Sequence, residues 1–103
     1  MISVRFEWDE AKNLSNRRKH DGLSFEEAQK VFEDPLHVSV QDRIEGGEQR
    51  WQTVGAVQGL LILVVAPTVT EEDAEGRSVE VIRIISARRA TPRERRRYEN
   101  EDG

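Results

Sequence analysis

Hydrophobic positions spaced for a helix first occur between residues 9 and 19. Asp9 can cap a helix that runs to about Lys19, with Ala11, Leu14 and the stem of Arg18 on its inner face. This apolar stripe is thin. We therefore expect the helix to lie beside the edge of a sheet rather than over its centre.

A capping box opens a second helix. The hydroxyl of Ser24 can accept a hydrogen bond from the amide of Glu27, while the Glu27 carboxylate reaches back to the amide of Ser24. Apolar residues then recur at helical spacing between Phe25 and Phe32, which gives the helix one apolar face. Pro35 ends it, because the residue before a proline avoids the helical conformation.

Four strand-like stretches follow, at residues 36–41, 49–57, 60–66 and 78–86. The first alternates apolar and polar residues, as half-buried antiparallel strands do, and the third is apolar on both faces and should be central. Residues 67–77 are acidic and are expected to form a long exposed loop. The order of the strands predicts a four-stranded antiparallel meander, with the two N-terminal helices packed on one face.

Thr91, Pro92 and Glu94 form the start signal of a final helix. Its body is rich in arginine and has almost no apolar face, so burial in a core cannot hold it. We expect either an exposed arm or a partner-binding element. The predicted fold class is therefore α+β, in a single domain that covers residues 1–103.

Composition narrows the class of protein further. The chain has 103 residues, no cysteine and only two histidines, which argues against disulfides and against a metal centre. No cofactor is expected. No apolar run is long enough to cross a bilayer, and the N-terminal residues lack the hydrophobic region of a signal peptide. These features predict a cytoplasmic protein without a membrane partner.

The net charge of −4 hides a strong segregation along the chain. Residues 77–97 contain eight arginines and two glutamates, a balance of +6. Residues 1–76 carry eight basic and fifteen acidic side chains, and three more acidic residues follow Arg97. Such asymmetry suggests one surface that faces a polyanion.

The first candidate group for chemistry is basic and lies around the end of the last predicted strand. Arg83 is expected to point away from the core, followed by Arg88 and Arg89, and Arg50 could reach the same sheet face. Planar guanidinium groups hold phosphate well, and the ring of Trp51 or Tyr98 could stack on a base. Alternatively, these arginines pair with the many carboxylates of the chain.

The second candidate group is Lys12, Lys19 and His20. Histidine can exchange a proton near neutral pH, and a nearby lysine could favour its neutral, basic form. Alternatively, His20 only ends a helix. His37 is expected on a solvent-facing strand position and has little functional weight. The sequence lacks the acidic set of a two-metal nuclease, so any phosphodiester chemistry is expected to proceed without metal.

These motifs, taken in order, resemble the BrnT toxins of bacterial type II toxin-antitoxin systems. The similar segments are Phe6-Glu7-Trp8-Asp9, Lys12, Asn16, Lys19-His20, Ser24 to Ala28, Val31 to Pro35, Gly47-Glu48 with Arg50, Arg83 to Ala90 and Arg93-Glu94-Arg95. The resemblance covers nearly the whole chain. It implies a RelE-like fold, an RNA-cleaving activity and a BrnA-type ribbon-helix-helix antitoxin that, in complex with the toxin, represses their shared operon.

We therefore expect a metal-independent endoribonuclease in which the ribose 2'-hydroxyl attacks the adjacent phosphate and leaves a cyclic phosphate. The expected roles are phosphate stabilisation by Arg50, Arg83 and Arg88, proton transfer by His20 or Lys19, and RNA positioning by Lys12, Arg89 and Trp51. Operator DNA would be a partner only through the toxin-antitoxin complex. Two alternatives remain open: a non-catalytic module in which residues 88–97 bind DNA or an acidic protein, and arginines that chiefly contact the antitoxin.

Overall fold

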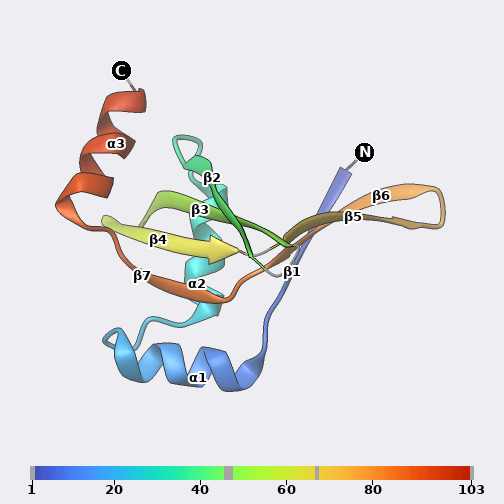
Figure 1. The fold of residues 1–103 in the computed structure, drawn as a ribbon, viewed down its shortest axis with the longest axis horizontal. Coiled ribbons are helices and arrows are strands. Elements are labelled where there is room, and N and C mark those ends of the chain that lie inside the picture. The colour runs from blue at the N-terminus through green and yellow to red at the C-terminus, as the bar shows by residue number, and fades with distance from the viewer. Residues whose placement is uncertain (1, 46–47, 67, 103) are drawn as a thin grey trace.

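A computed structural model describes residues 2–45, 48–66 and 68–102. The elements, in chain order, are β1 (Ile2–Glu7), α1 (Glu10–Lys19), α2 (Phe25–Ala28), the 3-10 helix η1 (Gln29–Glu33), β2 (Val38–Glu45), β3 (Glu48–Val57), β4 (Leu60–Ala66), β5 (Thr68–Ala74), β6 (Arg77–Arg83), β7 (Ser86–Arg89) and α3 (Pro92–Asp102) (Figure 1). Gly47, which contributes to the family resemblance, lies outside the described residues. No helix within the described ranges is long and apolar enough to span a membrane.

The strands form two sheets, so the expected single four-stranded meander is wrong, although the α+β class holds. One sheet has the order β1-β6-β5, with β1 parallel and β5 antiparallel to β6. The other is antiparallel and has the order β2-β3-β4-β7. The segment 78–86, predicted as one strand, is divided between the two sheets.

The chain changes sheets at Ile84. The Ile84 amide still donates to the Glu7 carbonyl of β1 at 3.0 Å, whereas Ser86 already pairs with Val65 of β4. Ile84 is fully buried and Ala87 is also buried, so both halves of the segment contribute to the core. The hydrophobic pattern therefore continues from β6 into β7. It gives no sign that the chain leaves one sheet and enters the other.

The acidic segment 67–77, expected as a loop, is mostly a strand. Leaving aside Pro67, which lies outside the described residues, β5 pairs with β6 from Thr68 opposite Arg83 to Ala74 opposite Arg77. Glu75 and Gly76 form the turn with positive φ angles of 56° and 76°. Figure 1 shows this hairpin extending away from the helices. Charged residues are common in edge strands such as β5, because they discourage pairing with another chain.

The core lies between the four-stranded sheet and the segment formed by α2 and η1. Phe25 and Val31 from this segment are fully buried against Ile62, Val64 and other apolar residues of the sheet. Any Cβ added at Gly55 of β3 would lie only 2.8 Å from Val31 Cγ1. The absence of a side chain at this glycine therefore allows η1 to lie directly on β3.

The inner face of α1 is polar rather than apolar. Asn13 is fully buried and accepts a hydrogen bond from the amide of Phe25 at 2.8 Å. Asn16 accepts from the amide of Ala87 in β7 at 3.1 Å and donates to the carbonyl of Leu23 at 3.1 Å. These hydrogen bonds attach α1 beside β7, which is an edge strand of its sheet.

The residues predicted for that inner face, Ala11, Leu14 and Arg18, are all exposed. The prediction of the inner face relied on apolar residues alone. In the structure, two buried asparagines lie on that face and form hydrogen bonds with backbone groups of the neighbouring elements. A buried polar group is tolerated when it is hydrogen-bonded, and here both asparagines are.

Candidate functional site

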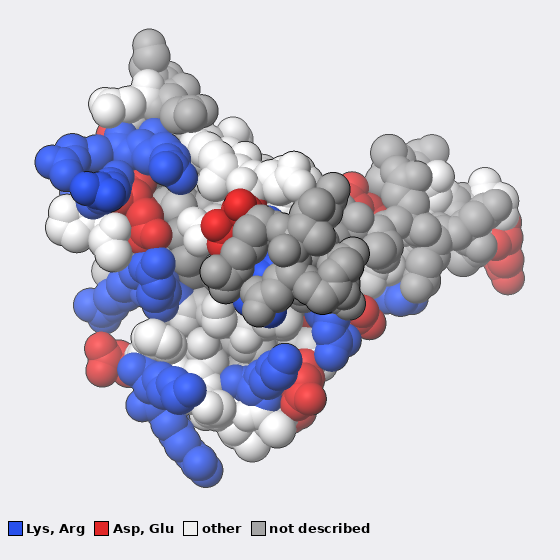
Figure 2. Space-filling view, in the orientation of Figure 1, with Lys and Arg blue, Asp and Glu red and all other residues white. Residues whose placement is uncertain are grey.

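Basic side chains gather along one side of the molecule. Figure 2 shows lysine and arginine over α3 and over the C-terminal part of α1, with further basic side chains between these helices. Arg93, Arg95, Arg96 and Arg97 of α3 are all exposed. Within the described ranges, no three histidine, aspartate or glutamate side chains come together in a way that could hold a metal ion.

A hollow of about 350 Å³ opens between the end of α1 and the end of β7. We call it the basic hollow, and its lining residues are Lys19, His20, Asp21, Arg88, Arg89 and Thr91. Four of the eight residues selected from the sequence therefore come together here, although about 70 positions of the chain separate the two pairs.

The local structure of α1 and β7 brings these residues together. The hydrogen bond from the Ala87 amide to Asn16 holds the last turn of α1 against β7, directly before Arg88. The helix then ends at His20, whose amide donates to the Asn16 carbonyl at 2.9 Å. Asp21 and Gly22 follow with φ angles of 52° and 83°, and the Gly22 amide donates to the Arg17 carbonyl at 2.8 Å. The left-handed conformation of Asp21 and Gly22 ends the helix, and the chain changes direction directly after His20.

A smaller hollow of about 130 Å³ adjoins the first one. Leu23, Glu27, Leu60 and Ile62 contribute to its lining, and both hollows share His20, Asp21 and Arg89. Among the described residues, the His20 ring has no hydrogen-bond partner. An imidazole and a guanidinium are thus placed where two surface depressions meet.

Arg88 is less available than its place in the basic hollow implies. Its guanidinium binds the Glu94 carboxylate with two hydrogen bonds, of 2.8 and 2.9 Å. Glu94 also accepts from the Thr91 amide at 2.8 Å, as expected for the capping box of α3. The Arg88 hydrogen bonds lower the pKa of Glu94 to about 2, against the opposing effect of burial. Arg88 therefore fixes the start of α3 as well as lining the hollow.

The Glu94→Gln variant is expected to lose about 1 to 2 kcal/mol of stability at pH 7, since it loses the charge that pairs with Arg88. Glu94 has a lower pKa when folded than its ordinary value of 4.5, so its contribution is complete above about pH 4.5 and disappears as the pH falls towards about 2. Urea unfolding of both proteins at pH 7, 4 and 2.5 measures this difference.

The control for this measurement is Glu99→Gln. The Glu99 carboxylate lies 3.7 Å from the Arg95 guanidinium, and both side chains are exposed. This exposed pair should contribute less than about 0.5 kcal/mol at any pH. A stability difference for Glu94→Gln that does not decrease in acid would show that its carboxylate charge is not responsible.

The other predicted residues lie outside the basic hollow. Arg83 lies on β6, in the other sheet, 3.7 Å from the Glu7 carboxylate. Lys12 is exposed on α1, and Arg50 is half-buried on β3. The sequence suggested one site because Arg83 precedes Arg88 so closely. The change of sheets at Ile84 separates them.

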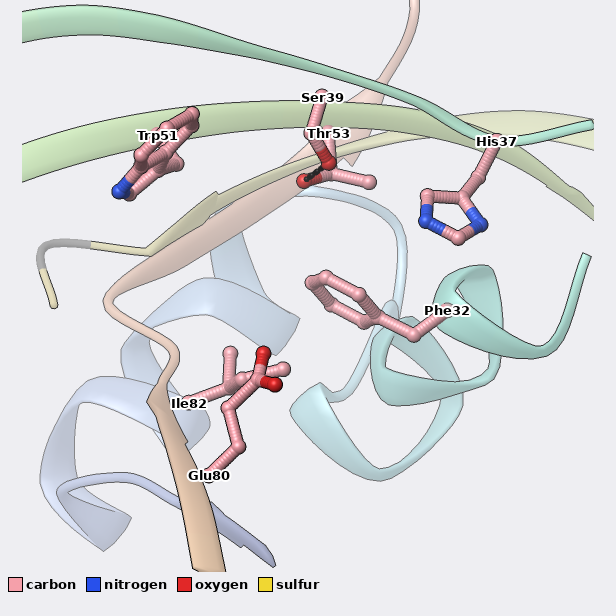
Figure 3. Close-up of a pocket in the computed structure, with 7 residues that line it drawn as sticks. All are labelled: Phe32, His37, Ser39, Trp51, Thr53, Glu80 and Ile82. Carbon is pink, nitrogen blue, oxygen red and sulfur yellow. Dashed lines mark hydrogen bonds between the residues drawn. The ribbon is translucent and has the colours of Figure 1, made fainter. Parts of the chain in front are cut away.

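Trp51 lines a different cavity, which we call the inter-sheet pocket. Its volume is about 240 Å³, and its lining residues are Phe32, His37, Ser39, Trp51, Thr53, Glu80 and Ile82 (Figure 3). His37, expected on a solvent-facing position, is half-buried here, with its ring 5.9 Å from that of Phe32. In the sequence, His37 alternates with apolar residues, which indicates only that it lies on one face of a sheet. This pattern gives no sign that η1 and β6 enclose that face.

Comparison with known proteins finds a matching family model. A family model described as "Ribonuclease toxin, BrnT, of type II toxin-antitoxin system" matches residues 8–94. That range includes every residue that lines the basic hollow and the inter-sheet pocket. No curated protein matches the chain.

Proposed function

Because the chain belongs to the BrnT family of ribonuclease toxins of type II toxin-antitoxin systems, we propose that it cleaves RNA in the basic hollow. Membership of the family brings an RNA target and an antitoxin partner with it. The observation that supports the place of cleavage is the meeting of His20 and Arg89 at the junction of two hollows, with Lys19 beside them.

The proposed reaction is an attack of the ribose 2'-oxygen on the adjacent phosphorus. The P–O5' bond breaks, and the products are a 2',3'-cyclic phosphate and a 5'-hydroxyl. One group must accept the proton of the 2'-hydroxyl, another must give a proton to O5', and cations must stabilise the charge that develops on the phosphate oxygens.

We assign proton transfer to His20, with Lys19 as the alternative group. Both line the basic hollow, and the imidazole has nitrogens without partners among the described residues. Arg89 is exposed and lines both hollows, so it is placed to bind the reacting phosphate. Arg88 contributes positive charge beside it, reduced by its pairing with Glu94. No step of this scheme uses a metal ion, because amino-acid side chains supply the cations.

We further propose that the antitoxin is a BrnA-type ribbon-helix-helix protein, and that the toxin reaches operator DNA only in complex with it. Because the arginines of α3 are exposed, an antitoxin that binds them should present an acidic surface. Similar charges would also suit a module that binds nucleic acid without cleaving it. A cleavage assay separates the two activities.

Purified protein without antitoxin should cleave single-stranded RNA in excess EDTA, and Arg89→Ala should cleave about 100-fold more slowly because the phosphate loses a cation. Cleavage is followed by gel electrophoresis, and the cyclic phosphate is detected by mass spectrometry. Lys30→Ala is the matched control, since Lys30 is an exposed cation on η1 that lines neither hollow. Loss of cleavage in EDTA would contradict the metal-independent scheme, and salt-dependent binding without cleavage would favour the non-catalytic module.

A further inference from the structure

The inter-sheet pocket has the size and the walls of a site for one flat ring. Its volume of about 240 Å³ lies just below the range of about 300 to 1,000 Å³ that is usual for drug-sized ligands. The rings of Phe32 and Trp51 and the side chain of Ile82 make much of its lining apolar. Aromatic rings of this kind bind nucleic-acid bases by stacking.

The polar groups of the pocket have fixed orientations on one side. Nδ1 of His37 lies 2.7 Å from the carbonyl oxygen of Asp34, so this nitrogen donates and Nε2 of the neutral ring is left as an acceptor. The hydroxyls of Ser39 and Thr53 are 2.8 Å apart. Their mutual hydrogen bond uses only one of their two hydrogens, so the pair can still donate to an oxygen on a ligand.

Glu80 supplies the charged group of the pocket from the opposite sheet. Figure 3 shows its carboxylate pointing from β6 into the pocket, towards Ser39 and Thr53. Glu80 forms no hydrogen bond or ion pair with the described residues, and it is half-buried. A carboxylate without a partner in a largely apolar pocket suits a ligand that offers N–H donors.

We propose that the inter-sheet pocket binds one unpaired guanine base of the RNA and so selects the sequence that is cleaved. Guanine presents two neighbouring donors, N1–H and the N2 amino group, which match the two oxygens of the Glu80 carboxylate. Its O6 is an acceptor for the hydroxyl pair. Adenine and cytosine place an acceptor beside their amino group, and uracil has one donor between two acceptors, so each would set a lone pair against the carboxylate.

The pocket is within reach of an RNA strand that occupies the basic hollow. Arg89 pairs with Ile62 of β4, whereas Trp51 pairs with Ala66 at the other end of that strand. Four residues of a strand span about 13 Å, but Ile62 and Val64 are buried under α2 and η1 along this line. An RNA strand would therefore pass over the surface of α2 and η1, and would need more than four nucleotides at roughly 3.4 Å each. The inference rests on the proposed function only for this connection between the pocket and the basic hollow, since the pocket can bind a base whether or not the RNA is cleaved.

The test measures binding with Trp51 as the reporter. The chain has two tryptophans, so Trp8→Phe leaves Trp51 as the only one. Fluorescence titrations use heptamers of deoxyuridine whose central nucleotide carries guanine, hypoxanthine, adenine or cytosine. These oligomers have no 2'-hydroxyl and cannot be cleaved by the proposed reaction. We expect guanine to bind at least about tenfold more tightly than adenine or cytosine. Hypoxanthine, which lacks the N2 amino group, should be intermediate.

Glu80→Gln, made in the same Trp8→Phe protein, should reduce the preference for guanine to less than about twofold. Glu33→Gln is the matched control, because Glu33 is exposed and lies outside the pocket, and it should keep the preference. Equal affinity for the four oligomers, or a guanine preference that survives Glu80→Gln, would overturn the proposal. Guanine-selective binding in a protein that cleaves no RNA would refute the ribonuclease scheme alone, and cleavage without selective binding would refute the pocket alone.

Discussion

Replacing His20 with glutamine should slow RNA cleavage by about 10² to 10⁴-fold, the range typical for the loss of a general acid or base. Glutamine keeps much of the size of the imidazole and can still form hydrogen bonds, but it cannot exchange a proton. The side chain is only half-buried, so the fold should tolerate the change. Single-turnover cleavage of a labelled RNA measures the effect, and circular dichroism verifies the fold.

Two further variants identify the role of His20. In His20→Gly, added imidazole should restore part of the rate, because a diffusible base can occupy the space that the side chain has left. Lys19→Gln should cost less than His20→Gln if the lysine only supplies charge. A large loss in Lys19→Gln with a normal rate in His20→Gln would transfer the proton-transfer role to the lysine.

Replacing Asp34 with alanine should lower the free energy of unfolding by about 2 to 3 kcal/mol. Its carboxylate accepts hydrogen bonds from the amides of Leu36 and Ala56 and from the hydroxyl of Tyr98, at 3.0, 2.8 and 2.8 Å. It thereby joins the end of η1 to β3 and α3. The alanine variant would leave all three donors without this acceptor, and urea unfolding at pH 7 measures the cost.

The pH dependence of stability provides a second readout for Asp34. Burial alone would raise its pKa, but the hydrogen bonds from Ala56, Leu36 and Tyr98, together with the nearby His37, lower it below the ordinary value. A lowered pKa means that the ionised group stabilises the fold above the ordinary value and loses this effect as the pH falls through the folded pKa. The difference between wild type and Asp34→Ala should therefore decrease in acid.

The matched comparison is Tyr98→Phe, which removes one of the three hydrogen bonds and should cost about 1 kcal/mol. It would also loosen α3, since this hydrogen bond joins the helix to Asp34. If Asp34→Ala were no more destabilising than Tyr98→Phe, the amide hydrogen bonds of Asp34 would contribute nothing measurable.

Local signals in the sequence predicted the helices well. The capping box at Ser24 is present, with the Glu27 amide donating to the serine hydroxyl at 3.1 Å. The start of α3 at Pro92 is also as predicted, because Thr91 and Glu94 interact across only three residues. Such signals are reliable since all their atoms lie within one turn of chain. Only the later part of the second helix differs, where residues 29–33 tighten into a 3-10 helix.

The division into two sheets could not be predicted in this way. β1 pairs with β6 over a separation of about 76 residues, and nothing in either segment specifies the other. The same holds for the site. Lys19 and His20 could be selected as chemically suitable, as could Arg88 and Arg89. The two pairs come together because α1 lies against β7, where the Ala87 amide donates to Asn16, 71 residues away.

The inter-sheet pocket illustrates a different limit. The ring of Trp51 marks this residue as a candidate in the sequence, whereas His37 and Glu80 are ordinary residues of their own segments. Their proximity arises from η1 lying against β3 and from β6 facing it. A pocket between two sheets is a property of how the sheets are placed, and hydropathy patterns do not encode that placement.

The separation of His20 from Arg89 along the chain has a consequence for the time at which the protein becomes active. A ribosome that adds about 5 to 20 residues per second needs about 3 to 14 s to make the 69 steps between these residues. Until Arg88 and Arg89 have been made, the basic hollow cannot form. In the proposed scheme, a nascent chain that ends before Arg89 therefore lacks the group assigned to bind the reacting phosphate. Cleavage by the proposed scheme therefore begins only after residue 89 has been made.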